Sequence, residues 1–546
     1  QVFPEQAWLV SETYNFPDFR ENGTTALLLP FFAYGRWLPK LETGERRWGT
    51  PVDHEDVAQA LAALFFSIAA FIVAISASRF YMGGRHIWLS VALLVFGTPT
   101  LWYVFLEPYG TDIFSNIVLS GSLFLYLVLL RSKFNPGWWL LLGSSLAFGA
   151  AVKVYGAFYL MTIGLQIAAR WFLERRARER THQLIFFSAG AALVSALFLA
   201  NHFLKFGVLE SQYWTLQKYY SLFNPTDFFS SPFYIYFGPS GWIYTSPIYA
   251  VAFASAFLWL RDRFMAKGAA LKVTALSFRF VLLFTPFFIL LMTSFAMVDE
   301  NIGTARRLAA QQFPFLLGLQ FLFYRANAKG PRRFYAAAAV AAGVWGFLMI
   351  VRYAANKDIF GEGYLAPVSE WPVLAARLSS ELAVGLAGVL PAASSLIGWI
   401  PAIAVCAGLL VFVWRSCMRG LESKRALWAV LPLTAAPVVI YCALSISNLL
   451  LNRSNIEKLK VMGAFEKTVV GRGISIYIYD DLISVIPKFK QLAKVRGDPV
   501  LAEGAAQIER TFLADAASHV IVDPIGFRDA CNKGITRPSY FEMFRP

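Results

Sequence analysis

The chain has 546 residues, of which 57% are hydrophobic and only 15% charged, and its formal net charge is +15. Soluble domains have about 25% charged residues, so this composition, with a mean hydropathy of +0.52, excludes a soluble protein and predicts a polytopic membrane protein. The excess Lys and Arg residues lie in short loops between apolar runs, and no nucleic-acid-binding motif accompanies them, so nucleic acid is excluded as a partner.

Segment 1–56 is predicted to be the first extracytoplasmic loop. It opens with "FPEQAWLVSETYNF" (3–16), which sets the carboxylate of Glu5 among aromatic and apolar residues. The sequence begins without Met, and the loop pattern described below places residue 1 outside. We therefore expect a further transmembrane helix before Gln1 that this sequence does not include.

The segment 57–448 is predicted to be a multi-span transmembrane domain. It contains a pair of short spans in 137–172, with Lys153 near the break between them. The other apolar runs are about as long as a membrane-crossing helix, which needs about 17–25 residues. They lie at 57–80, 87–106, 113–130, 183–204, 241–260, 278–297, 307–324, 334–351, 398–414 and 426–448.

Basic clusters fall at every second loop, and "RWFLERRARER" (170–180) is the densest of them. By the positive-inside rule these loops are cytoplasmic. This orientation predicts a bacterial inner-membrane protein whose remaining loops face outward. Those outward loops are 1–56, 107–112, 205–240, 298–307, 352–397 and the chain after 448.

The tail 449–546 has a different composition and is predicted to be a small extracytoplasmic α/β domain. "GISIYIYD" (473–480) and "ASHVIVDP" (517–524) alternate or run apolar like strands, and "AEGAAQIERTFLADA" (502–516) reads as a helix. It has no Gly-rich phosphate loop, so its role is not readable from sequence. The fold class predicted for the whole chain is an all-α membrane bundle with this α/β appendage.

Ionisable side chains beside the spans gather on the predicted outer side, where an acid can deprotonate an acceptor and paired guanidinium groups can hold a phosphate. This combination favours transfer of a group from a lipid phosphate, with phosphate as the leaving group. The candidate residues are Glu5, Glu107, Asp112, Lys153, Tyr155, Arg306 and Arg307.

Several stretches resemble, in order across about 1–325, the integral-membrane glycosyltransferases of the GT-C fold that use polyprenyl-phosphate sugars. The likeness is to the branch of protein O-mannosyltransferases and the aminoarabinose transferase of lipid A. The stretches are "FPEQAWLVSE", "NGTTALLLPFFAYG" (22–35), "FGTPTLWYVFLEPYGTDIFSN" (96–116), "WWLLLGSSLAFGAAVKVYGAF", "SGWIYTSPIYAVA" (240–252) and "NIGTARRLAAQQFPFLLGL" (301–319).

The resemblance implies a role for several residues. Glu5 matches an acid of the family's first-loop pair and would be the catalytic base, with Asp112 as a second catalytic candidate. Arg306 and Arg307 match paired basic positions and would hold the donor phosphate, and Lys153 falls near a phosphate-contacting position. The substrate-binding group would also include Tyr155 and Glu107. No cofactor is implied, although a divalent metal is compatible with the fold.

Two positions depart from the family pattern: Pro4 stands where the family often has Asp, and Asn116 where it has His. These departures keep a second hypothesis open, a non-catalytic membrane subunit of a larger complex. A transporter is a third and weaker hypothesis, because no repeated pair of broken spans is visible. For the enzyme, the predicted partners are the polyprenyl-phosphate sugar, a lipid, glycan or protein acceptor, and membrane lipids.

Each candidate also has a plainer interpretation. Glu5 can be a solvated loop acid, and Arg306 and Arg307 can anchor to lipid headgroups. Asp112 can simply cap the helix that starts at Ile113, and Lys153 can reach to the interface from a tilted helix. The sequence does not distinguish these roles from catalytic ones.

Overall fold

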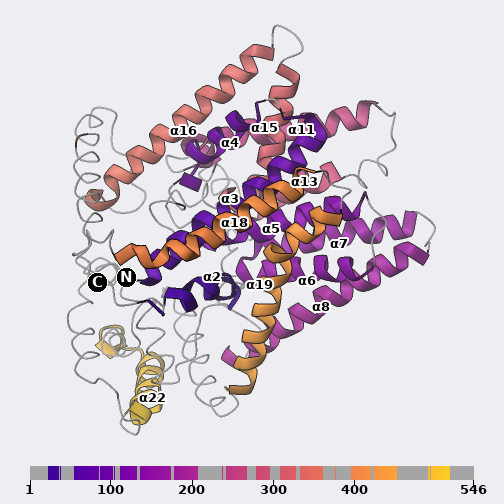
Figure 1. Ribbon diagram of the computed structural model, residues 1–546. Helices are drawn as coiled ribbons and strands as arrows, with labels where there is room; N and C mark the ends of the chain where they lie inside the picture. Colours follow the sequence, from indigo (N-terminus) through magenta and orange to yellow (C-terminus); the bar gives the residue numbers. More distant parts are fainter. Residues whose placement is uncertain are drawn as a thin grey trace. The chain divides into compact units, whose positions relative to one another are not determined.

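The structure is a computed structural model of the whole chain, and its helices are shown in Figure 1. The residues that it describes are 22–35, 37–38, 54–84, 86–101, 104, 111–131, 136–173, 178–206, 236–237, 241–266, 278–294, 308–326, 332–360, 376, 395–419, 424–451, 490–491 and 493–516.

The described residues form helices throughout and include no strand. The main helices are α2 (Asn22–Gly35), α3 (His54–Met82), α4 (Ile87–Phe96), α5 (Thr111–Leu129), α6 (Gly137–Val152), α7 (Tyr155–Leu173), α8 (Arg178–Phe206), α10 (Trp242–Thr245), α11 (Ile248–Ala266), α13 (Phe278–Ser294), α15 (Gln312–Ala326), α16 (Arg332–Phe360), α18 (Ile400–Cys417), α19 (Lys424–Leu451) and α22 (Pro499–Ala516), with a 3₁₀ turn, η4, at Ser395–Trp399.

Six helical segments in the described part are long and apolar enough to cross a membrane. This is the architecture of an all-α, multi-pass membrane protein. The six segments are Val57–Met82, Tyr155–Leu173, Arg178–Asn201, Arg333–Arg352, Ile397–Cys417 and Arg425–Ser447, and the shorter apolar helices Ile87–Phe96, Ile113–Leu129, Gly137–Val152 and Phe278–Leu291 accompany them.

The predicted apolar runs correspond to helices, with three differences. The run 87–106 was expected to be one span, but α4 ends at Phe96, where Gly97 caps it. The run 241–260 was also expected to be one span, but it divides into α10 and α11. A further helix, α2, lies inside the segment predicted as the first outer loop. In the C-terminal tail, α22 confirms the predicted helix. Both predicted strands fall outside the described residues, so the α/β domain stays a prediction.

The helices divide into two compact units. The larger unit comprises 22–195 and 216–442 and contains most of the apolar helices. In the described part of the smaller unit, the Asn201 side chain at the end of α8 donates to the carbonyl of Ser445 in α19, 3.2 Å away. There Asp498 also caps α22 by accepting from the backbone N–H groups of Val500 and Leu501, at 3.1 and 3.0 Å.

Helix α15 is the centre of the larger unit, because it packs on α11, α3, α4, α16 and α5. Its side chains are buried from Leu308 to Phe323. Around it, α3 packs on α5, α2 and α18, and α18 runs beside α3 in Figure 1. The helices therefore enclose a core that is apolar on most faces.

Arginines from loops far apart in sequence meet at one end of the larger unit, which we call the basic end. The guanidinium of Arg131, just after α5, lies 4.5 Å from the ring centre of Phe80 in α3. Arg279, at the start of α13, lies 4.5 Å from the ring of Trp259 in α11. Arg325, at the end of α15, makes a 2.8 Å ion pair with Asp262. The basic clusters at every second loop of the sequence predicted that these arginines lie at one end. Which side of the membrane this end faces stays a prediction.

The helix ends that point away from these arginines form the opposite end. Helices α5 and α6 run antiparallel: Tyr126 packs on Trp139 near the basic end, and Ser122 and Ser145 share a 2.8 Å hydrogen bond further along. The end of α6 and the starts of α5 and α7 are therefore at the opposite end. Helix α2 begins there too, because Gly23 lies against the backbone of Ala151 and Val152 in α6.

Candidate functional site

The turn between α6 and α7 places Lys153 and Tyr155 together at the opposite end. Lys153 takes an extended conformation (φ −158°, ψ 141°), which ends α6. Its backbone N–H donates to the carbonyl of Gly149 at 2.9 Å, and its own carbonyl accepts from Gly156 at 3.0 Å. The predicted division of 137–172 into two helical segments near Lys153 is therefore confirmed.

This turn is tight because its two helices touch backbone to backbone. A Cβ added to Gly156 would overlap the backbone of Gly149 and Ala150. Small residues allow such close approach between membrane helices. The close contact fixes Lys153 and Tyr155 relative to each other: the Lys153 Nζ lies 6.0 Å from the centre of the Tyr155 ring, at the limit of a cation–π contact.

Tyr159 links this turn to α15. It lies one turn after Tyr155 on α7 and is fully buried. Its hydroxyl donates to the Gln311 Oε1 at 3.4 Å, where the α15 segment begins. The turn thus carries three polar side chains in succession, those of the half-buried Lys153, of Tyr155 and of Tyr159. The last of them contacts the start of α15.

Gln312 joins the start of α15 to two other helices. Its Nε2 donates to the Thr100 Oγ1 at 2.6 Å, just beyond α4, and to the Tyr249 hydroxyl at 2.9 Å, in α11. Thr100 is positioned in turn by Thr98, whose hydroxyl lies 2.9 Å away. We call Thr100, Tyr159, Tyr249, Gln311 and Gln312 the polar layer. It lies inside an otherwise apolar bundle, where each amide needs hydrogen-bond partners.

Several buried polar atoms around the polar layer have no hydrogen-bond partner in the described part of the chain. They include the Gln311 Nε2 and Gln312 Oε1 atoms, although the other side-chain polar atom of each glutamine is bonded. Unpaired buried polar atoms are costly and uncommon. The remaining ones near the opposite end are Asn116 Nδ2, Ser115 Oγ, Trp242 Nε1, Ser246 Oγ and Arg352 Nε.

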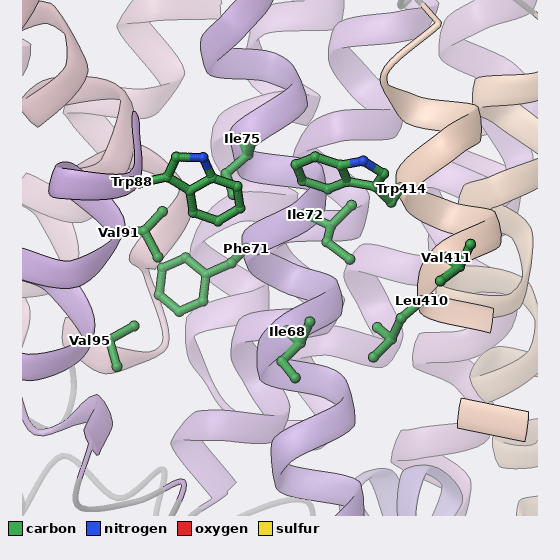
Figure 2. A pocket seen from close by; sticks show the side chains of 10 residues that line it. All are labelled: Ile68, Phe71, Ile72, Ile75, Trp88, Val91, Val95, Leu410, Val411 and Trp414. Atoms are coloured by element: carbon green, nitrogen blue, oxygen red, sulfur yellow. The ribbon is translucent and has the colours of Figure 1, made fainter. Parts of the chain in front are cut away.

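An apolar groove lies on another side of the larger unit, between α3, α4 and α18. Its volume is about 390 Å³, within the usual range of about 300–1,000 Å³ for ligand pockets. Figure 2 shows Trp88 and Trp414 facing each other across one end, and their rings stack 5.9 Å apart. Its lining is wholly apolar, which suits an aliphatic chain: Ile68, Phe71, Ile72, Ile75, Trp88, Val91, Val95, Leu410, Val411 and Trp414.

Most of the sequence-predicted site residues lie outside the described residues. Glu5, Glu107, Arg306 and Arg307 are in this group, so their predicted roles stay predictions. Asp112 is in the first turn of α5, at the opposite end, but only its backbone is described. The structure brings together Lys153 and Tyr155.

Sequence reasoning missed the buried amides of the polar layer and the buried arginine Arg352. A usable signal for the amides was the pair Gln311–Gln312 inside an apolar run, since a polar side chain at membrane depth needs a partner. Arg352 sits directly after the predicted run 334–351 and was assigned to a loop, whereas α16 continues through it to Phe360.

Within the described ranges, no three His, Cys, Asp or Glu side chains gather into a group that could hold a metal ion. Comparisons with protein-family models, with curated proteins and with solved structures found no match to this chain.

Proposed function

We propose that the chain is a membrane glycosyltransferase that moves a sugar from a polyprenyl phosphate to a lipid, glycan or protein acceptor on the outer face of the bacterial inner membrane. The observation that carries the proposal is the position of Lys153. A half-buried ammonium group stands at the end opposite the arginine clusters, beside the start of α7.

The sequence around the opposite end adds the other groups that such a reaction needs. The pair Arg306–Arg307 directly precedes Leu308, which leads into the polar layer at Gln311. The segment containing Glu5 precedes α2, whose start packs on the end of α6 beside Lys153. The acid, the ammonium group and the guanidinium groups thus lie, in sequence, shortly before helices that begin at the opposite end.

The proposed reaction is a single displacement. The Glu5 carboxylate removes a proton from the acceptor hydroxyl, whose oxygen attacks the anomeric carbon of the donor sugar. A glycosidic bond forms as the bond between that carbon and the phosphate oxygen breaks. The polyprenyl phosphate leaves with the electron pair, and Lys153, Arg306 and Arg307 stabilise its negative charge.

The test is sugar transfer by the purified full chain from labelled polyprenyl-phosphate sugars to membrane-extract acceptors. Glu5→Gln keeps the shape of the side chain but removes the base, and transfer should fall by at least about 100-fold. Glu12→Gln is the matched control, in the same segment and with the same change, and should retain transfer. Equal transfer by parent and Glu5→Gln protein would remove Glu5 as the base.

Absence of transfer in the parent chain would favour the second hypothesis, a non-catalytic subunit. That outcome is informative when donor binding is measured in the same preparation. A chain that binds polyprenyl phosphate without transferring sugar is a binding subunit of a larger membrane complex. A chain that neither binds nor transfers contradicts both hypotheses.

A further inference from the structure

Arg352 is a buried arginine in helix α16. Its relative exposure is 7%, and its Nε has no hydrogen-bond partner among the described residues. No described carboxylate forms an ion pair with it either. A buried cation without a counter-charge costs several kcal/mol, and ionisable residues at membrane depth generally mark functional sites.

The position of Arg352 is fixed by the packing of α16. Gly346 lies against the backbone of Gly97, where an added Cβ would overlap the Gly97 carbonyl. On the neighbouring face, the Trp345 Nε1 donates to the Tyr244 carbonyl of α10 at 2.8 Å, and the two rings lie 5.8 Å apart. Arg352 shares the Trp345 face and lies about 10 Å further along the axis, towards the opposite end.

Two helices that pack on α16 also carry buried donors that lack acceptors in the described part of the chain. Trp242, in α10, is only 4% exposed, and its Nε1 has no partner in the described part of the chain. The Gln311 Nε2 is in the same state at the start of α15, a helix that packs on α16. Indole and guanidinium groups can only donate. A ligand that supplies acceptor oxygens would satisfy donors of this kind.

We propose that Arg352 binds a phosphate group on the α10 side of α16. A guanidinium matches two phosphate oxygens at once, and the bound anion supplies the missing counter-charge. A phosphate bound there would pair with a cation for which the described part of the chain supplies no carboxylate. The site is separate from Lys153: α16 packs on the α4 and α10 side of α15, whereas Lys153 belongs to α6 and α7.

The proposal does not depend on the transferase reaction, because it predicts binding without turnover. The experiment uses the full chain, exchanged into a neutral detergent without added lipid, and measures the unfolding midpoint temperature. One arm adds dioleoylphosphatidic acid or dioleoylphosphatidylcholine as mixed micelles. The other adds sodium phosphate or sodium chloride at equal ionic strength.

For the parent, phosphatidic acid should raise the midpoint by roughly 2–4 °C more than phosphatidylcholine does. Arg352→Gln should lose this difference, while Arg333→Gln, an exposed arginine on the same helix, should keep it. If sodium phosphate also raises the midpoint of the parent, the phosphate group is sufficient for binding. If only the lipid raises it, the acyl chains contribute to binding at the same site.

Two further variants separate ligand binding from a purely structural role. Arg352→Lys keeps the charge but loses the guanidinium group, which can donate to two phosphate oxygens at once. This variant should bind phosphatidic acid about tenfold more weakly. Arg352→Met removes an uncompensated charge, so without added ligand it should be at least as stable as the parent. The proposal is overturned if phosphatidic acid raises the midpoint of Arg352→Gln and of the parent equally, or if neither phosphate probe raises the midpoint of the parent. It is also overturned if Arg352→Met, without added ligand, unfolds at a clearly lower temperature than the parent.

Discussion

The two ends of the larger unit treat their charged side chains differently. At the basic end, Arg131 lies on the ring of Phe80, and Arg325 pairs with Asp262. At the opposite end, the described part of the chain offers Arg352 no such partner, and the polar layer keeps unpaired atoms. Unpaired atoms are not confined to the opposite end, because the Ser78 Oγ of α3 also has no partner in the described part of the chain. What distinguishes the opposite end is that a buried arginine is among them.

The largest expected effect comes from the turn that holds Lys153. Gly156→Leu would overlap the backbone of Gly149 and Ala150, so the free energy of unfolding should fall by more than about 3 kcal/mol. The matched control is Gly408→Leu, on α18, where an added Cβ meets nothing within 4 Å. The measurement is denaturation in sodium dodecyl sulfate. Equal losses in both variants would show that close contact does not hold the turn.

Removing one cation at each end tests the comparison itself. Lys153→Met should lower sugar transfer by about 100-fold, the usual cost of losing one donor to transition-state charge. Arg131→Met removes a cation at the basic end and should leave transfer unchanged. Initial rates at saturating donor give the answer. Comparable losses in the two variants would remove the functional distinction between the ends.

The polar layer can be tested with two glutamines of the same helix. Gln312→Met leaves the Thr100 and Tyr249 hydroxyl groups without their shared donor, which should cost about 1–3 kcal/mol of stability and also reduce transfer. Gln320→Met removes a 2.7 Å hydrogen bond to Ser90 and should cost a similar amount of stability. Transfer per folded molecule should fall only for Gln312→Met, and a fall for both would mean that α15 acts only as scaffold.

The smallest effect is expected at the basic end. Arg279→Gln loses a cation–π contact with Trp259 and a 2.9 Å hydrogen bond to its carbonyl. Such surface contacts contribute about 0.5–1 kcal/mol, so the unfolding midpoint should drop slightly and transfer should not change. A large loss of sugar transfer in this variant would place the transfer site at the basic end and contradict the comparison.

The helices were predictable wherever the signal was local. The length of apolar runs predicted α3, α5 and α19, and the length of 137–172 predicted a pair broken near Lys153. The end of α4 carried a local signal that was passed over, because Gly97 caps the helix and Pro99 follows two residues later. What could not be predicted is the contact of Gly97 with Gly346 of α16, a segment far away in sequence.

The candidate site was predictable only in part for the same reason. Lys153 is conspicuous as a charge within an apolar run. Gln312 and Arg352 are conspicuous only once α4, α10 and α11 are placed around them. A charge next to an apolar run looks like a loop residue until a continuing helix buries it.

The most direct test of where function lies is photo-crosslinking with a polyprenyl phosphate that carries a diazirine next to the phosphate. Labelled peptides should come from the opposite end, around the Lys153 turn and the start of α15 at 308–312, and free polyprenyl phosphate should compete with labelling. Labelling confined to the basic end, around Phe80 and Arg131, would contradict the account.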